Sequence, residues 1–320
     1  MPGTRHRPGR EGGVEPRPAA TVMMVRDGDD LEAPLEVLMV RRSLRSAFVG
    51  GAYVFPGGAV DPSDGEDAAT VLCAGRTDAE ASRDLGLPSG GLAYWVAALR
   101  ECFEEAGLLL ACIGASPVLL SLADEADARR IAGHRRGVNG RRRSFVEVCR
   151  EEGLRLPVDR VHYFSHWVTP VGSPRRFDTR FFVAAAPPFQ APANDAAETI
   201  DDVWVRPADA LALHRNGEID LILPTVRSLQ AIGRHPTAGA LLEAAATAPG
   251  PFPVMLPRVV AGAGGPRILL PGDPGYDEAV SSSGPGAGPE FDGVVRSASR
   301  SANVEQGPVP PPAGGARPVP

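Results

Sequence analysis

The sequence predicts an α/β sandwich, because strand-like and helix-like patterns alternate along one continuous stretch of the chain. Apolar and β-branched runs predict strands at 19–27 and 35–43, and an apolar period of 3.6 residues predicts a helix at about 93–106. The chain also contains 37 Gly and 33 Pro, many of them near its two ends. Such composition predicts disordered tails around the folded part.

The expected elements follow in order. A short apolar strand lies between the glycines of "GGAYVFPGGAVDP", and the acidic, Gly- and Ser-rich residues 63–92 predict an inserted loop. A helical region is expected at about 117–152, followed by two strands in "HYFSHWVTP" and "RFDTRFFVAAAP". The rest predicts a strand, a short helix starting at Pro207, a helical segment broken near Pro236, and a small hairpin in "RVVAGAGGPRILLPGD".

These elements divide the chain into four expected parts. Residues 1–18 form a disordered tail, and 19–247 form one domain with insertions at about 63–92 and 117–158. A C-terminal extension with the candidate hairpin covers 248–276, and a second disordered tail covers 277–320.

Composition excludes several function classes. The net charge of −6 argues against a nucleic-acid binder, and the lack of any lysine excludes a lysine nucleophile or a P-loop lysine. No apolar run reaches the roughly 18 residues of a membrane helix.

The four cysteines show no zinc spacing, so a reducing cytoplasm is expected. The arginine-rich "RRGVNGRRR" is interpreted as a solvated surface rather than as an anion site.

The stretch "ALRECFEEAGLLL" carries the expected chemistry. On a helix, Glu101, Glu104 and Glu105 share one face, and Gly107 stands where a helix commonly ends. Like charges at this spacing destabilise an isolated helix, unless a hard divalent cation neutralises them. The alternative is an ordinary solvated acidic face.

The same stretch resembles half of a known motif. "RECFEEAGL" is similar to the second half of the Nudix box, GX5EX7REUXEEXGU, with Cys102 at the first apolar position. "FPGGAVDPSD" resembles the first half through Gly57 and Gly58, with Asp64 in place of the family's glutamate. Arg100 follows Asp64 by 36 residues where the family spacing is eight, so 28 residues are inserted. Looping them out costs on the order of 1 kcal/mol.

A split box of this kind resembles the Nudix sub-branch that includes peroxisomal coenzyme A diphosphatases. The resemblance implies an α/β/α sandwich with a mixed sheet, a cofactor of Mg²⁺ or Mn²⁺, and hydrolysis of a diphosphate that links a nucleoside to a second group. It also makes a homodimer an expected assembly. The partner is then a small-molecule nucleotide rather than a nucleic acid or a membrane.

The resemblance also implies roles for individual residues. Glu101, Glu104 and Glu105 hold the metal with the Gly58 carbonyl, and Arg100 braces the glutamates. The general base is either a box glutamate or a later loop acid, for which Glu198 is the candidate.

Substrate binding is expected upstream of the box. Gly51 and "FPGG" fit the coenzyme A signature, but Ala47 and Tyr53 depart from it. The candidate substrate-binding residues are Arg41, Arg42, Arg45, Gly57 and Gly58. Coenzyme A or acyl-CoA is the leading substrate, and ADP-ribose, NADH and dinucleoside polyphosphates stay open. The rival hypothesis is a Nudix-fold module that binds or senses a nucleotide without catalysis.

Overall fold

The computed structural model describes residues 14–279, apart from residues 31, 33, 44–49, 195–198, 249 and 261–266. Most of the two expected tails, 1–18 and 277–320, therefore lies outside the described residues. Strand β1 begins at Arg17, so the last two residues assigned to the N-terminal tail belong to a strand.

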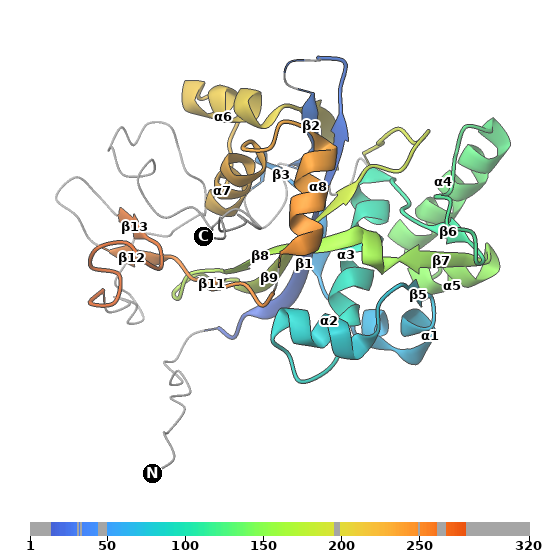
Figure 1. The fold of residues 1–320 in the computed structure, drawn as a ribbon, viewed down its shortest axis with the longest axis horizontal. Helices are drawn as coiled ribbons and strands as arrows, with labels where there is room; N and C mark the ends of the chain where they lie inside the picture. Colours follow the sequence, from blue (N-terminus) through green and yellow to red (C-terminus); the bar gives the residue numbers. More distant parts are fainter. Residues whose placement is uncertain are drawn as a thin grey trace, which may run out of the picture.

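A mixed sheet of eight strands forms the centre of the described structure (Figure 1). Its main path runs β10-β2-β1-β9-β8-β11, with β3 beside β2 and β4 beside β1. The β1–β9 and β8–β11 pairs are parallel, and the other pairs are antiparallel. The strands are β1 (Arg17–Asp27), β2 (Leu35–Arg42), β3 (Tyr53–Val54), β4 (Gly57–Ala59), β8 (Val161–Val168), β9 (Phe177–Ala185), β10 (Thr199–Val205) and β11 (Val254–Met255).

Successive side chains of β1 enter two separate hydrophobic cores, because strand side chains alternate between the faces of a sheet. Val22 and Met24 pack on the face of helix α3 (Leu92–Ala106), whereas Met23 and Val25 pack on the opposite face. That opposite face is covered by α6 (Pro207–Asn216), α7 (Leu223–Ile232) and α8 (Ala238–Thr247). The predicted α/β/α sandwich with a mixed sheet is confirmed.

The segment 63–92 is not the loop that its composition predicted. It contains the 3₁₀ helix η1 (Pro62–Gly65), α1 (Asp67–Thr70), β5 (Cys73–Ala74) and α2 (Asp78–Leu85). Thr77 and Glu80 form a capping box at the start of α2, and Gly86 ends it in the left-handed conformation. The prediction was wrong because such short elements bury too few apolar residues to produce a clear periodicity.

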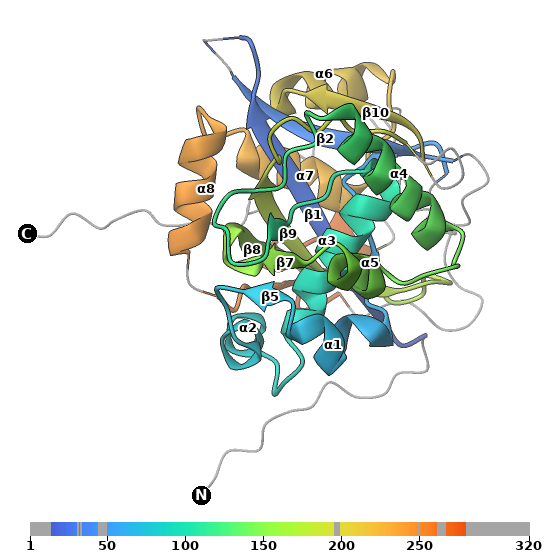
Figure 2. The ribbon, with the colours of Figure 1, turned by 90° about the vertical axis from the view of Figure 1, so that its right-hand side faces the viewer.

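The second insertion forms an accessory unit with the first. It contains α4 (Glu125–Asn139), α5 (Phe145–Glu151), β7 (Leu154–Pro157) and the 3₁₀ helix η2 (Val158–Arg160), so the helical region begins about eight residues later than expected. β7 pairs in parallel with β5 of the first insertion and antiparallel with β6 (Cys112–Ile113). Figure 2 shows α1, α2, α4 and α5 gathered around α3.

The C-terminal extension contributes to two sheets. Val254 and Met255 form β11 at an edge of the central sheet, beside β8. β12 (Arg258–Val260) and β13 (Arg267–Leu269) pair antiparallel where the hairpin was expected. None of the helices within the described residues has the length and apolar character of a membrane span.

Candidate active site

Helix α3 is held firmly where it carries the acidic residues. The Trp95 indole nitrogen donates to the Val161 carbonyl at 2.8 Å, and the Trp95 ring lies 4.6 Å from that of Phe182. Gly107 ends the helix with φ +73°, a conformation that favours glycine. The last two turns, from Arg100 to Glu105, therefore have a fixed place on the sheet.

Arg100 joins the two halves of the split box. Its Nε donates to Asp64 Oδ1 at 2.9 Å and its Nη2 donates to Asp64 Oδ2 at 3.0 Å, so the ion pair is bidentate. The same Nη2 also donates to the Ala59 carbonyl at 2.9 Å, on β4. Asp64 is 1% exposed, and its Oδ2 accepts from the Asp61 amide at 2.8 Å, which closes the turn η1. The two halves of the box therefore meet in the fold, although the inserted elements separate them in the sequence.

Burial and charge act in opposite directions on this pair. Burial raises the pKa of the Asp64 carboxyl above its ordinary value, and Arg100 partly offsets the increase. Burial lowers the pKa of the Arg100 guanidinium, but Asp64, Glu101 and Glu104 outweigh it and raise that pKa above its ordinary value. Arg100 is therefore a permanent cation among carboxylates.

Two of the three helix glutamates lie against the glycine strand β4. The Gly57 amide donates to Glu105 Oε2 at 3.0 Å. A Cβ atom added at Gly58 would lie 2.5 Å from Glu101 Oε1, so only glycine leaves room for that carboxylate. Glu101 also accepts from Arg100 Nη1 at 2.8 Å, whereas Glu104 lies 3.4 Å from the same nitrogen. Glu101 and Glu105 are buried, and Glu104 is partly exposed.

The chemistry of these groups fits a hard divalent cation, since carboxylate and carbonyl oxygens are its preferred ligands. The close approach of Glu101 to Gly58 and of Glu105 to Gly57 brings such oxygens to one place. In the part of the chain that the structure describes, no three His, Cys, Asp or Glu side chains are already grouped as a metal site. Arg100 instead draws Glu101 and Glu104 toward itself.

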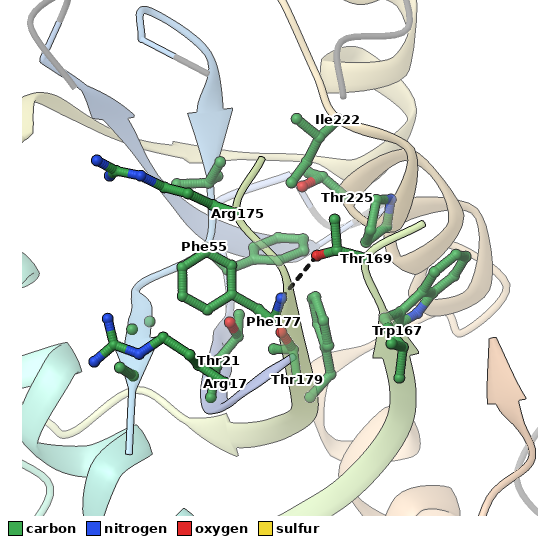
Figure 3. Close-up of a pocket in the computed structure, with 18 of the residues that line it drawn as sticks. Arg17, Thr21, Phe55, Trp167, Thr169, Arg175, Phe177, Thr179, Ile222 and Thr225 are labelled. Atoms are coloured by element: carbon green, nitrogen blue, oxygen red, sulfur yellow. Dashed lines mark hydrogen bonds between the residues drawn. The ribbon is translucent and has the colours of Figure 1, made fainter. Parts of the chain in front are cut away.

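A cavity of about 380 Å³ opens from these carboxylates. Its walls include Gly57, Gly58, Glu101 and Glu105 at one end and the start of α7 at another. Figure 3 shows several of the lining side chains, and the hydrogen bond from the Phe177 amide to Thr169 Oγ1, 3.0 Å long, that fixes part of the wall. This size is typical of a small-molecule site.

The upstream arginines fall into three situations. Arg42 lines the cavity. Arg41 does not; its Nε donates to the Gly51 carbonyl at 3.2 Å and its guanidinium lies 5.9 Å from the ring centre of Tyr53. Arg45 and the candidate base Glu198 lie outside the described residues.

Several cavity residues were not expected from the sequence. Arg17 falls in the expected N-terminal tail, and Arg175 lies between the two strands expected in "HYFSHWVTP" and "RFDTRFFVAAAP". The aromatic wall consists of Phe55, Trp167, Phe177 and Phe181. Alternation along β9 could have placed Phe177 and Phe181 on one face, but nothing in the sequence says that this face lines a cavity.

The C-terminal end of helix α3 is also held by residues outside the predicted site. One of them, Arg135, belongs to the "RRGVNGRRR" stretch, so the interpretation of that stretch as a solvated surface was wrong for this residue. Arg135 on α4 donates from Nε and Nη2 to the Glu104 carbonyl at 3.0 and 2.8 Å, and from Nη2 to the Glu105 carbonyl at 2.9 Å. Asn139 donates to the Glu104 carbonyl at 3.1 Å, and Thr199 Oγ1 donates to the Glu105 carbonyl at 3.0 Å. These donors satisfy carbonyls that a helix end leaves without intrahelical partners.

The chain is similar to known proteins over most of its length. The family model for the NUDT19 Nudix domain matches residues 69–232, which include Arg100 and the three helix glutamates. The acyl-coenzyme A diphosphatase NUDT19 of Gallus gallus is 28% identical over 310 residues, covering 84% of this chain and 82% of that protein. The Homo sapiens protein of the same name is 28% identical over 274 residues, covering 76% and 72%.

A solved structure shares both the fold and part of the sequence. The crystal structure of a NUDIX hydrolase from Alicyclobacillus acidocaldarius aligns with a TM-score of 0.56 and 29% identity, covering 72% of this chain and 96% of that one. The family match spans just over half of the 320 residues and contains the arginine and glutamates of the box. The chain therefore belongs to the NUDT19 Nudix domain family and is a Nudix hydrolase.

Proposed function

We propose that this protein is a metal-dependent pyrophosphohydrolase whose substrate is coenzyme A or an acyl-CoA. The observation that carries the reaction class is the bidentate Asp64–Arg100 pair, which assembles the split box beside Glu101. The substrate is supported by the names of the chicken and human relatives, both acyl-coenzyme A diphosphatases.

In this proposal the acidic residues form the reaction centre. Glu101, Glu104, Glu105 and the Gly58 carbonyl would hold Mg²⁺ or Mn²⁺, which would supply positive charge for the diphosphate oxygens of the substrate. Arg100 positions Glu101 and Glu104 through its hydrogen bonds. The Gly57 amide holds the Glu105 carboxylate on the cavity side.

The proton of the attacking water needs an acceptor. A box glutamate or Glu198 takes this role in the proposal. The residue after Glu198 supports the second choice, because Thr199 is fully buried and donates to the Glu105 carbonyl at 3.0 Å. That contact ties the chain just beyond Glu198 to the end of the catalytic helix. A pH profile of kcat in Glu198→Gln distinguishes the two candidates.

Further parts of the proposal concern substrate contacts and setting. Arg42, which lines the cavity, binds substrate together with Gly57 and Gly58. Arg41 and Arg45 are the other two proposed substrate-binding residues. The location is the cytoplasm, which is supported by four buried free cysteines. The assembly is a homodimer, and the partner is a small molecule rather than a nucleic acid, which the net charge of −6 supports.

The test is a panel of substrates with the purified full chain and either Mg²⁺ or Mn²⁺. The panel contains coenzyme A, acetyl-CoA, ADP-ribose, NADH and diadenosine tetraphosphate, with products identified by mass spectrometry. We expect the two CoA compounds to be cleaved at the P–O–P bridge, to adenosine 3′,5′-bisphosphate and a phosphopantetheine. Lack of turnover on every compound contradicts the enzyme assignment, and a preference for another compound contradicts the substrate.

A further inference from the structure

The cavity combines an aromatic wall with cations at its rim. Trp167 and Phe181 are buried, at 3% and 5% exposure, and they line the cavity from β8 and β9. Phe55 is also buried, and Phe177 is partly exposed. Flat aromatic walls of this kind suit a planar ring, because stacking on aromatic side chains is favourable for any nucleobase.

Two arginines border this wall. Arg17 lies at the start of β1, directly beside Phe177 in the parallel β1–β9 pairing, and Arg175 precedes β9. Both are exposed and both line the cavity. In Figure 3 the two guanidinium groups extend toward the same side, and the rings of Phe55 and Phe177 are drawn between them.

Neither arginine is neutralised by another side chain in the part of the chain that the structure describes. Across the described residues the Arg17 and Arg175 side chains form no ion pair and no hydrogen bond, unlike Arg100, Arg180 or Arg206. Arg17 also lies apart from the glycine strand β4. β4 pairs with β1 only from Ala19 to Thr21, so Arg17 lies beyond the end of the glycine strand.

We propose that Arg17 and Arg175 bind a phosphate monoester on the ribose of the substrate, while the adenine ring lies against the aromatic wall. The inference rests on the proposed function, since the diphosphate of the substrate is then engaged at the glutamate end of the cavity. Two cations that form no ion pair among the described residues are available to bind an additional anion. Coenzyme A carries such a phosphate on its ribose, whereas ADP-ribose, NADH and diadenosine polyphosphates do not. The two arginines thus select the 3′-phosphorylated nucleotide.

The experiment compares coenzyme A with dephospho-CoA, which lacks only that phosphate. We expect the wild type to prefer coenzyme A in kcat/KM, and Arg17→Ala and Arg175→Ala each to lose roughly tenfold on coenzyme A, the effect of one hydrogen bond to a charged group. Activity on dephospho-CoA stays nearly unchanged. Arg150→Ala is the control, because Arg150 is an exposed arginine on α5, remote from the cavity lining.

A binding measurement makes the test independent of turnover. Calorimetry compares the binding of adenosine 3′,5′-bisphosphate and AMP in the presence of EDTA. The wild type should bind the bisphosphate more tightly than AMP. The double variant with both Arg17→Ala and Arg175→Ala should bind the two nucleotides equally. Equal losses on coenzyme A and dephospho-CoA assign the arginines to the diphosphate and overturn the proposal. A loss of kcat/KM in the two variants that depends on the length of the acyl chain on coenzyme A also overturns the proposal. If the wild type cleaves neither compound, the proposed function fails, and the binding measurement still decides the inference.

Discussion

Asp64 and Arg100 lie 36 residues apart in the chain and form a buried, bidentate ion pair at 2.9 and 3.0 Å. Between them the chain builds α1, β5 and α2 and then returns, so the glycine strand β4 and helix α3 meet. The pair joins the base of the first insertion to the proposed reaction centre.

Asp64→Asn should destabilise the protein, because it leaves a buried guanidinium with less negative charge. Arg100 retains Glu101 and Glu104, so we expect a loss of about 3 kcal/mol in the free energy of unfolding, at the lower end for a broken buried pair. Urea unfolding measures this loss. Asp67→Asn is the control, an exposed neighbouring acid expected to change stability by less than about 0.5 kcal/mol. Equal stability of the two variants would contradict a structural role for the pair.

The two glycines of β4 should respond differently to alanine. At Gly57 the added Cβ would lie 2.6 Å from the Ala20 carbonyl oxygen, which is backbone, so Gly57→Ala should disturb the β1–β4 pairing and lower the melting temperature. At Gly58 it would meet the Glu101 side chain, which can move aside. Gly58→Ala should therefore stay folded but lose Mn²⁺ affinity and activity. Full activity of folded Gly58→Ala contradicts the proposed position of Glu101.

Glu104→Gln keeps the size of the side chain and removes its charge. If Glu104 holds the metal, kcat should fall at least about 100-fold, the upper end of what losing a residue that orients a metal ligand costs. Stability should change by less than about 0.5 kcal/mol, since the lost pair with Arg100 is partly exposed and a repulsion between glutamates is relieved. Steady-state kinetics check this, with Glu243→Gln on α8 as an exposed control. Unchanged kcat removes Glu104 from the metal site.

Arg135 is expected to position the catalytic helix from outside. Arg135→Ala removes three hydrogen bonds to the Glu104 and Glu105 carbonyls and should cost about 1–2 kcal/mol of stability. If the helix end shifts, kcat should fall several-fold with little change in KM, and Arg135→Lys should restore part of the loss. Arg136→Ala, an exposed neighbour on α4, is the matched control. A change in KM alone would instead indicate direct contact with substrate.

Acid should weaken the sheet at the β8–β9 pair. Although burial raises the pKa of Asp178, its contacts with His166 and Arg180 outweigh burial and lower that pKa below its ordinary value. The unfolded state therefore binds a proton more readily, so this stabilisation is complete above about pH 4 and is lost as pH falls below it. Urea unfolding between pH 6 and pH 3 should show a shallower decline in Asp178→Asn than in the wild type. Parallel pH profiles would exclude a contribution from Asp178.

The sequence by itself determined the local features of this protein. Except for the short strands β4 and β11, the strands of the sandwich follow from spacing and residue type, and so do the amphipathic helix that carries Arg100 and three glutamates and its end at Gly107. These features depend on neighbours within a few residues, which is why periodicity and capping rules find them. The count from Asp64 to Arg100 also exposed the insertion.

Only the tertiary structure decided what depends on distant contacts. The pairing of β5 with β7 joins two insertions that composition leaves unrelated. Arg17, Phe55 and the β8–β9 hairpin with Trp167 and Arg175 are three separate segments, and they share one cavity only after the sheet forms. Arg135 reaches the catalytic helix from another insertion. Such contacts leave no short-range pattern, because the order of strands in the sheet, rather than the spacing of residues, brings them together.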